Sequence, residues 1–470
     1  MQRPTRCTMS QRTSTRKCTI VTYTRRTRPT LPLWRNNTNR FGHSVKFSDR
    51  DFKPYIDFKN AEAVRELTYC LLRQDFNIEM DIPLDMLCPT VPNRLNYILW
   101  IEDVIQNDRE VGPIVRGIDI GTGASCIYPL LGCAMNKHWT FLGTDINDRS
   151  LTYARANVAR NGLGDQIHLF LNKDPEKVLP LDEVEGLDAG ARYTFCMCNP
   201  PFYESLEQLE ESANNKELPP SAVCTGTENE MITPGGEFQF IMRIVQESMV
   251  LRERVRWYTS TIGRRETLDK LVTELKTLKI DNYVVTDFCQ GRTRRWGIGW
   301  SFGDHRPPSY KTTSSAPIYK KLKRLAPPTT VFRLRLSYPS TAVQRALCAL
   351  FDALGARAEW DDGKAEFIGR VVRNTWSRAA RRKKLEQEEE KGGDREVLFE
   401  FRCQILETGR KDDADGIAEK EEGGEGTEVV MMWTVGKDRE VFMGFWSHIM
   451  KKLEERLVVE GGEEAKSTRT

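Results

Sequence analysis

The residues best suited to chemistry are Asn199, Pro200, Pro201 and Phe202, which follow the apolar run Thr194 to Cys198. Two successive prolines after a buried strand predict a rigid turn at the edge of a sheet. The Asn199 side-chain oxygen and the Pro200 carbonyl can accept both hydrogens of a planar amine, and Phe202 can stack on its ring. This arrangement predicts methyl transfer to the N6 amine of adenine. The alternative is a structural turn that buries one aromatic side chain.

A second candidate site lies where the first predicted strand ends. Asp119, Gly121 and Gly123 follow this strand, and Asp145 ends the next strand, 24 residues after Gly121. Glycines at a strand end let the backbone approach a ligand closely, and an acid at the second strand end can accept ribose hydroxyl hydrogens. A third glycine at the dinucleotide spacing is missing, so a nucleoside cofactor without pyrophosphate fits better than NAD. The pattern favours S-adenosyl-L-methionine, although a glycine pair also occurs in purely structural turns.

Alternating strand and helix patterns position these two sites. They are typical of a parallel sheet with helices on both faces, so we expect a doubly wound α/β domain. A mostly helical segment from about Asp57 to Trp100 precedes it and resembles a lid. The seven strands are expected at Ile114–Ile120, Trp139–Thr144, Ile167–Leu171, Tyr193–Cys198, Val255–Ile262, Tyr283–Phe288 and Arg295–Phe302. Both candidate sites then lie at the carboxyl ends of the strands, where such sheets bind ligands.

The chain continues into a second predicted domain. Residues 303–330 are rich in Pro and Ser, which interrupt helices and central strands and indicate a linker. A strand, a helix, three strands and a closing helix then predict a smaller α+β domain at residues 331–460. We therefore assign residues 51–302 to the first domain and expect residues 1–50 to form a basic, disordered arm.

Composition narrows the classes of function. The 470 residues are 39% hydrophobic and 29% charged, and no apolar run approaches the roughly 18 residues that a membrane span needs. Five histidines and scattered cysteines form no metal-ligand pattern, so neither a membrane protein nor a metal enzyme is expected. Residues 1–45 contain nine arginines and Lys17 but no acidic residue. This start fits an arm that binds phosphates, a mitochondrial targeting segment, or a tail without a role.

Five longer stretches stand out between Asp57 and Phe302. They are AEAVRELT from Ala61, TVPNRLNY from Thr90, DIGTGASCIYPLLG from Asp119, CMCNPPF from Cys196 and FCQGRTRRW from Phe288. Together they resemble the family of U6 small nuclear RNA adenine-N6 methyltransferases, which is related to bacterial large-subunit ribosomal RNA adenine-N6 methyltransferases. Matches of this length are more specific than an isolated glycine motif.

The resemblance implies a fold, a cofactor, site residues and a partner. The fold is a Rossmann-like class I methyltransferase domain, and the cofactor is S-adenosyl-L-methionine. Arg94, Gly121, Asp145 and Asn199 are implied to contact the cofactor, and Asn199 to Phe202 to hold the target adenine. The implied partner is a structured RNA, such as U6 small nuclear RNA, which places the protein in the nucleus or the cytoplasm. The family often has glutamate where this chain has Asp145, and the shorter side chain still suits ribose hydroxyls.

Arginines predict how an RNA would be held. The family has a lysine-bearing loop where this chain has Gly263-Arg264-Arg265. Arginine keeps the positive charge of lysine, but its guanidinium group is planar and carries several hydrogen-bond donors. Arginines cluster near the last strands, so we expect them to bind phosphates around a flipped base. The set is Arg254, Arg256, Arg264, Arg265, Arg292, Arg294 and Arg295. In the second domain, Arg333 and Arg335 alternate with apolar residues, which suggests an accessory RNA-binding face or a dimer or scaffold surface.

Three functions fit the sequence. The first is adenine-N6 methylation of RNA, either U6 small nuclear RNA or ribosomal RNA. The second is methylation of a protein, because a similar Asn-Pro-Pro-aromatic turn holds the side-chain amide of glutamine, although such an enzyme has no use for so many arginines. The third is a non-catalytic RNA-binding factor that retains the fold. No protein partner is indicated.

Overall fold

The computed structural model divides into two compact units. One consists of residues Met1–Phe302 and Thr313–Leu325, and the other of Gly303–Thr312 and Ala326–Thr470. The structure describes residues 44–47, 54–106, 108, 110–184, 191–208, 228–290, 293–307, 324–377, 380, 396–408 and 426–467. Within these residues, no helix combines the length and the hydropathy needed to cross a bilayer.

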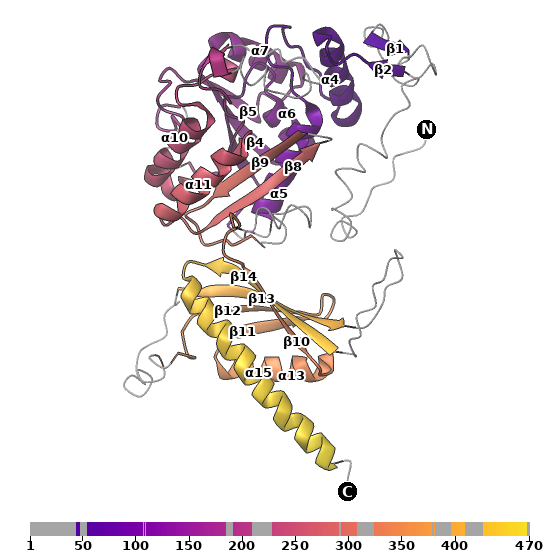
Figure 1. Cartoon of the computed structure of the whole chain (residues 1–470), viewed down its shortest axis with the longest axis vertical. Coiled ribbons are helices and arrows are strands. Elements are labelled where there is room, and N and C mark those ends of the chain that lie inside the picture. Colours follow the sequence, from indigo (N-terminus) through magenta and orange to yellow (C-terminus); the bar gives the residue numbers. More distant parts are fainter. Residues whose placement is uncertain are drawn as a thin grey trace. The chain divides into compact units, whose positions relative to one another are not determined.

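A seven-stranded sheet forms the centre of the first unit (Figure 1). Its strands are β3 (Val115–Ile120), β4 (Trp139–Asp145), β5 (Ile167–Leu171), β6 (Tyr193–Cys198), β7 (Val255–Ile262), β8 (Tyr283–Gln290) and β9 (Thr293–Trp300). Their order is β5-β4-β3-β6-β7-β9-β8, and β9 runs antiparallel to both of its neighbours, β7 and β8. The predicted seven-stranded α/β domain is confirmed. The reversal of β9 follows from the short connection after β8, which is too short for a parallel crossover.

Helices cover both faces of this sheet (Figure 1). The helices α5 (Val91–Ile105), α6 (Ile127–Met135) and α7 (Asp148–Arg160) share one apolar core with the sheet, and α10 (Gly236–Leu251) and α11 (Arg265–Thr277) share the other. The first core contains Tyr97 and Phe195, and the second contains Ile241 and Trp300. Because both faces are buried, the strand ends remain the natural place for a ligand.

The segment before the sheet is less uniformly helical than the sequence predicts. It consists of α4 (Ala61–Phe76) and α5, joined by a loop, and α4 ends where Asn77 adopts a left-handed conformation with φ of 56°. Two short strands, β1 (Val45–Phe47) and β2 (Pro54–Ile56), pair antiparallel. The last residues of the arm that was expected to be disordered therefore belong to a hairpin. Composition alone does not show this pairing, because it depends on the partner strand. The rest of the arm lies outside the described residues.

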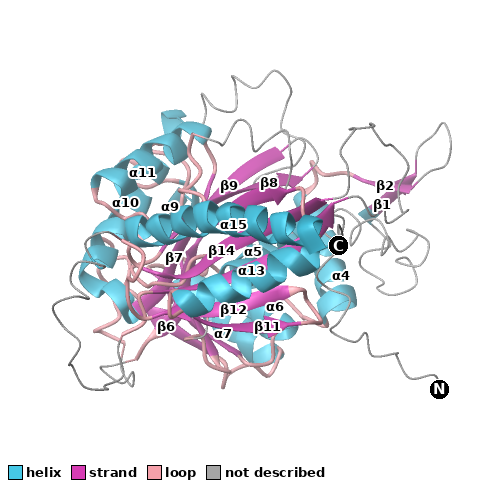
Figure 2. Ribbon diagram, turned by 90° about the horizontal axis from the view of Figure 1, so that it is seen from below, coloured by secondary structure: helices cyan, strands magenta, loops and turns pink. Residues whose placement is uncertain are grey.

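The second unit is an antiparallel sheet covered by two helices. Figure 2 shows α13 (Ser340–Ala353) and α15 (Arg439–Ser467) side by side over the sheet, and their apolar side chains, such as Phe351 and Phe442, fill its core. The strands are β10 (Val331–Leu336), β11 (Arg357–Asp361), β12 (Glu366–Val371), β13 (Phe399–Thr408) and β14 (Gly426–Gly436), in the order β10-β14-β13-β12-β11. The strand β11 was not predicted, because it is an edge strand whose alternation is weak, with mostly polar residues.

Candidate active site

The predicted transfer turn lies where β6 ends. We call residues Asn199 to Phe202 the transfer corner. Ile120 at the end of β3 pairs with Cys198, so the corner lies at the same sheet edge as the glycine loop. Pro200 is buried, whereas Asn199, Pro201 and Phe202 are half-buried. The protein core therefore holds the transfer corner in place, while the side chains of Asn199 and Phe202 remain partly accessible to a ligand.

A chain of hydroxyl groups supports the corner from behind. The Thr259 hydroxyl donates to the Cys196 carbonyl at 2.8 Å, which leaves its oxygen to accept from Tyr97, 2.7 Å away. The Tyr97 oxygen in turn accepts from the Cys198 amide at 3.3 Å. Burial raises the pKa of Tyr97, so its hydroxyl stays protonated and keeps donating. The helix α5 thus fixes the backbone that leads into Asn199.

A second threonine contacts the corner directly. The Thr261 hydroxyl lies 3.3 Å from the Cys198 carbonyl and 3.1 Å from Oδ1 of Asn199. One side chain of β7 therefore holds both the backbone before the corner and the Asn199 carboxamide.

The aromatic part of the corner packs closely against Gly263. A Cβ atom on Gly263 would lie 2.7 Å from the Phe202 ring, so only glycine leaves that ring in place. The buried Glu237 carboxylate accepts a hydrogen bond from the Gly263 amide. Burial raises the pKa of Glu237, although this hydrogen bond opposes the shift.

Two predicted RNA-binding arginines cover the aromatic residues of this region. The Arg295 guanidinium lies 5.5 Å from the centre of the Phe202 ring, and the Arg264 guanidinium lies 5.5 Å from the centre of the Tyr203 ring. These are cation–π distances, and both arginines are half-buried. Positive charge therefore surrounds the place where a stacked base would lie.

The glycine loop has the shape of a ligand cradle. Gly121 and Gly123 have φ of 70° and 62°, a region that favours glycine. The amides of Gly121 and Thr122 both donate to the Thr144 carbonyl at 2.9 Å, which ties the loop to β4. A Cβ on Gly121 would meet no atom within 4 Å, so open space adjoins the loop.

Two acidic residues hold this loop. Asp145 accepts hydrogen bonds from the Gly123 amide at 2.8 Å and the Asn147 amide at 2.9 Å. Asp119 is only 1% exposed and accepts a hydrogen bond from the Thr122 hydroxyl at 2.8 Å. Burial raises the pKa of both acids, that of Asp119 to about 7.

Arg94 reaches the same region from α5. Its guanidinium lies 5.5 Å from the centre of the Tyr128 ring, and its positive charge lowers the pKa of Asp119, against the larger effect of burial. The structure thus brings Arg94, Asp119, Gly121, Gly123 and Asp145 together at the strand ends, next to the transfer corner.

The comparison with known protein families decides what kind of protein this is. A family model described as RNA methyltransferase matches residues 34–304. The chain belongs to this RNA methyltransferase family. The resemblance drawn from the sequence motifs is confirmed by this match and by the names of the relatives.

Two curated relatives show how far the similarity extends. The chain is 45% identical to the Homo sapiens RNA N(6)-adenosine-methyltransferase METTL16 over 271 residues, which are 56% of this chain and 47% of that protein. It is 41% identical to the Schizosaccharomyces pombe U6 small nuclear RNA (adenine-(43)-N(6))-methyltransferase over 257 residues, 54% of this chain and 63% of that protein. The chain spans about half the length of the first of these relatives.

Solved structures support the fold of the methyltransferase unit. The hMettl16 catalytic domain in complex with MAT2A 3'UTR hairpin 1 matches with a TM-score of 0.53 and 41% identity, covering 59% of this chain and 92% of that one. The N-terminal domain of human METTL16 in complex with SAH matches with a TM-score of 0.50 and 38% identity. This match covers 60% of this chain and 97% of that one. The expected Rossmann-like methyltransferase domain is confirmed.

The structure corrects part of the predicted RNA-binding surface of the first unit. Arg254 forms an ion pair with Asp182, and Arg256 forms ion pairs with Asp108 and Glu110. Both arginines lie at the start of β7, at the opposite end from the transfer corner, so they hold the fold rather than the substrate. The sequence positions of Arg254 and Arg256 do not show which end of β7 lies beside the transfer corner.

The other predicted arginines have different surroundings. Arg294 is exposed, and Arg265 pairs with Asp269 one helical turn away at 3.1 Å. Arg292 lies outside the described residues. In the second unit, Arg333 and Arg335 are exposed as predicted, but Glu428 lies 2.7 and 3.4 Å from them and offsets part of their charge.

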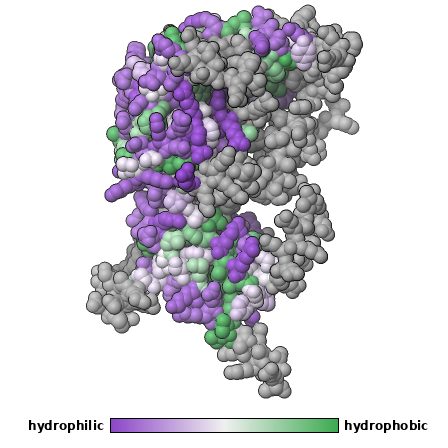
Figure 3. Space-filling model, viewed as in Figure 1, coloured by the Kyte–Doolittle hydropathy of each residue, from purple (hydrophilic) through white to green (hydrophobic). Residues whose placement is uncertain are grey.

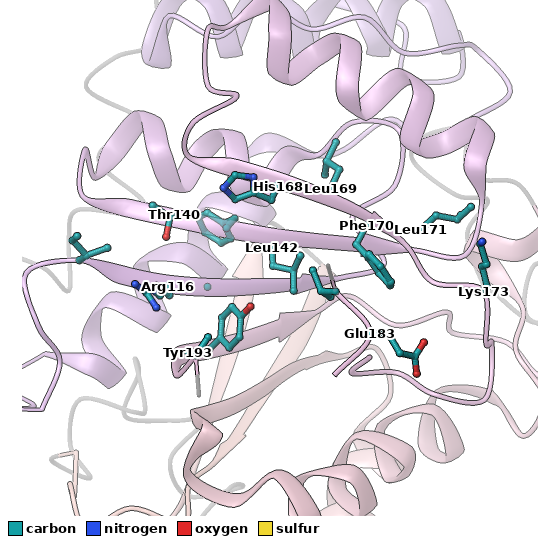
Figure 4. Close-up of a pocket in the computed structure, with 15 residues that line it drawn as sticks. Arg116, Thr140, Leu142, His168, Leu169, Phe170, Leu171, Lys173, Glu183 and Tyr193 are labelled. Atoms are coloured by element: carbon teal, nitrogen blue, oxygen red, sulfur yellow. The ribbon is translucent and has the colours of Figure 1, made fainter. Parts of the chain in front are cut away.

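The first unit also has a large hollow that none of the predicted site residues lines. It has a volume of about 1080 Å³ and lies over β3, β4 and β5; it reaches Leu171 at the end of β5 but not the carboxyl ends of β3 and β4 (Figure 4). The side chains in Figure 4 include Arg116, Thr140, Leu142, His168 and Tyr193. Size alone does not make it the active site, because the cradle and the acceptors of the transfer corner lie elsewhere.

Sequence reasoning missed the residues that support the site. Tyr97, Thr259 and Thr261 come from α5 and β7 and have no characteristic spacing relative to Asn199. The alternation of β7 could have placed Thr259 and Thr261 on one face of the strand, but not beside β6.

Proposed function

We propose that this methyltransferase transfers a methyl group from S-adenosylmethionine to the N6 amine of an adenosine in a structured RNA, with U6 small nuclear RNA as the substrate. The main support is the transfer corner itself, whose two acceptors and aromatic ring adjoin a nucleoside cradle and are flanked by Arg264 and Arg295. The functions that the names of the relatives give agree with this substrate class.

The residues of the cradle fit the proposed cofactor. Open space beside Gly121 accommodates a ligand, Asp145 offers acceptors for ribose hydroxyls, and Arg94 offers a cation for a carboxylate. When bound, S-adenosylmethionine supplies a methyl carbon activated by a sulfonium sulfur.

The transfer corner makes the adenine amine reactive. The amine lone pair is delocalised into the ring, so the amine is a poor nucleophile until its geometry changes. Asn199 Oδ1 and the Pro200 carbonyl accept the two amine hydrogens and favour a tetrahedral nitrogen whose lone pair points at the methyl carbon. Phe202 stacks on the base and fixes its plane.

Proton transfer makes little demand on the protein. As the carbon–nitrogen bond forms and the carbon–sulfur bond breaks, the nitrogen becomes positively charged and one of its protons becomes acidic. That proton leaves through the acceptors to solvent, so no strong general base is needed.

The surrounding charge favours RNA over a protein substrate. Arg264 and Arg295 lie over aromatic side chains beside the corner, where the phosphates of a flipped nucleotide would run. A glutamine side chain carries no such phosphates, and a purely RNA-binding factor would not need the cradle. A spliceosomal substrate also implies a nuclear location, which imaging of the tagged protein would test.

Nucleoside mass spectrometry tests the proposed function. The purified chain is incubated with S-adenosylmethionine and a hairpin from U6 small nuclear RNA that presents an unpaired adenosine. We expect N6-methyladenosine to form, and none to form when guanosine replaces that adenosine. Methylation of another atom, or no methylation of any RNA, would contradict the proposal.

A further inference from the structure

A short segment beyond the transfer corner returns to the cofactor cradle. The amide of Tyr203, the residue after the corner, donates to the Met231 carbonyl at 3.0 Å. The Thr233 amide donates back to the Tyr203 carbonyl at 2.9 Å. This pairing fixes the chain from Met231 to Thr233, directly after Glu230 in α9 (Glu228–Met231).

The Glu230 carboxylate lies against the glycine loop. Its Oε1 atom is 3.7 Å from the place a Cβ on Gly123 would occupy, and its Oε2 atom accepts a hydrogen bond from the Leu87 amide at 3.2 Å. Burial raises the pKa of Asp145, and the negative charge of Glu230 acts in the same direction. Glu230 therefore brings a further carboxyl group to the cradle, beside Asp145.

Acidic side chains at this place favour a ligand that carries positive charge. Neighbouring carboxylates repel one another where they are partly buried, and a nearby cation lowers that repulsion. The sulfonium sulfur of the proposed donor is positively charged, and this charge is lost when the methyl group leaves.

We propose that Glu230 is a specificity-determining residue of the cradle, which favours the cationic methyl donor over the neutral thioether product. The inference rests on the proposed function. A negative charge at this place stabilises the cationic donor but not the neutral product. It therefore favours binding of the donor before transfer and release of the product afterwards.

The variant Glu230→Gln tests the charge without removing the side chain. Glutamine has nearly the same size and keeps an oxygen that can accept from the Leu87 amide. Calorimetry on the full chain would measure the affinities for S-adenosylmethionine and S-adenosylhomocysteine separately. We expect the affinity for the donor to fall roughly tenfold while that for the product changes by less than about twofold.

Two further variants complete the experiment. Glu62→Gln removes an exposed glutamate from the first turn of α4 and should change neither affinity. Glu230→Ala removes the contact with Leu87 as well, and we expect it to weaken both ligands.

The outcomes separate this inference from the proposed function. Equal weakening of both ligands in Glu230→Gln, or no change in either, would overturn the role of the charge. If the unaltered chain binds neither ligand, the proposed function itself fails. If it binds both ligands and methylates RNA but its preference does not depend on Glu230, only the inference fails.

Discussion

The Thr261 hydroxyl donates to Oδ1 of Asn199 across 3.1 Å, at the end of β7 and beside the transfer corner. The same hydroxyl lies 3.3 Å from the Cys198 carbonyl. This contact restricts rotation of the Asn199 carboxamide, so its oxygen is already placed before a substrate arrives. A threonine on the neighbouring strand thus becomes part of the site.

Thr261→Val should lower the rate of methyl transfer with little effect on binding. Valine keeps the shape of threonine but lacks the hydroxyl, so the carboxamide can rotate. We expect kcat to fall about tenfold, while KM for the cofactor and the RNA affinity stay nearly constant. Steady-state kinetics and filter binding measure these quantities. Thr261→Ser keeps the hydroxyl and should restore most of the rate; equal loss in both variants would indicate a packing effect.

Gly263→Ala should displace the stacking ring. The new methyl group would lie 2.7 Å from the Phe202 ring and 3.1 Å from the Glu237 carboxylate, so the ring must move. We expect kcat/KM for RNA to fall by roughly tenfold or more, because the base loses its platform. Gly164→Ala is the matched control, since Gly164 is exposed and a Cβ there meets nothing within 4 Å. Unchanged kinetics in Gly263→Ala would mean that Phe202 does not stack on the base.

Arg295→Gln should weaken RNA binding in a salt-dependent manner. If Arg295 contacts a phosphate, its loss should reduce the slope of log affinity against log salt by about 1. Fluorescence anisotropy at several salt concentrations measures this slope. Arg155→Gln, on the exposed side of α7, is the control. An equal effect of both variants would indicate attraction to net charge rather than a specific contact.

Asp119 should make the stability of the methyltransferase unit depend on pH. Burial raises its pKa from 3.8 to about 7 in the folded state. Between these values the folded protein holds a proton that the unfolded chain has lost, so stability falls as pH rises through this window. Asp119→Asn does not titrate, and its stability relative to the parent should increase from pH 5 to pH 7.5.

Calorimetric melting at several pH values measures this difference. Asp148→Asn, at an exposed position of α7, should show no such trend. A difference between Asp119→Asn and the parent that stays constant with pH would contradict the raised pKa.

The central fold could be predicted because its periodic features are local. The apolar run before Asn199, the glycines after β3 and the acid at the end of β4 each depend on a few neighbouring residues. The β1–β2 hairpin and β11 were missed, since short or polar strands depend on pairing with partners rather than on their own pattern.

The limits at the site have the same origin. Motifs identify Asn199, Gly121 and Asp145. By contrast, Tyr97 contacts Cys198, which is 101 residues away in the sequence, and Glu230 contacts Leu87, which is 143 residues away. Arg256 was misassigned because its sequence position next to a functional strand does not reveal its carboxylate partners. Side-chain neighbours of this kind follow from tertiary packing, which no periodicity encodes.

Figure 3 shows a largely hydrophilic face of the methyltransferase unit, which suits a partner bound through charge and a few stacking contacts. Under the proposed function, binding and catalysis should be separable, because the arginines would hold the RNA while the corner would act on one base.

The variant Asn199→Ala tests the central claim most directly, because its RNA binding and its methyl transfer can be measured separately. RNA affinity and methyl transfer are determined on the same preparation, by anisotropy and by mass spectrometry of nucleosides. We expect RNA affinity within about threefold of the parent and transfer reduced by at least about a hundredfold, because one acceptor of the amine is lost. Transfer at the parental rate would contradict the role of the transfer corner and, with it, the proposed mechanism.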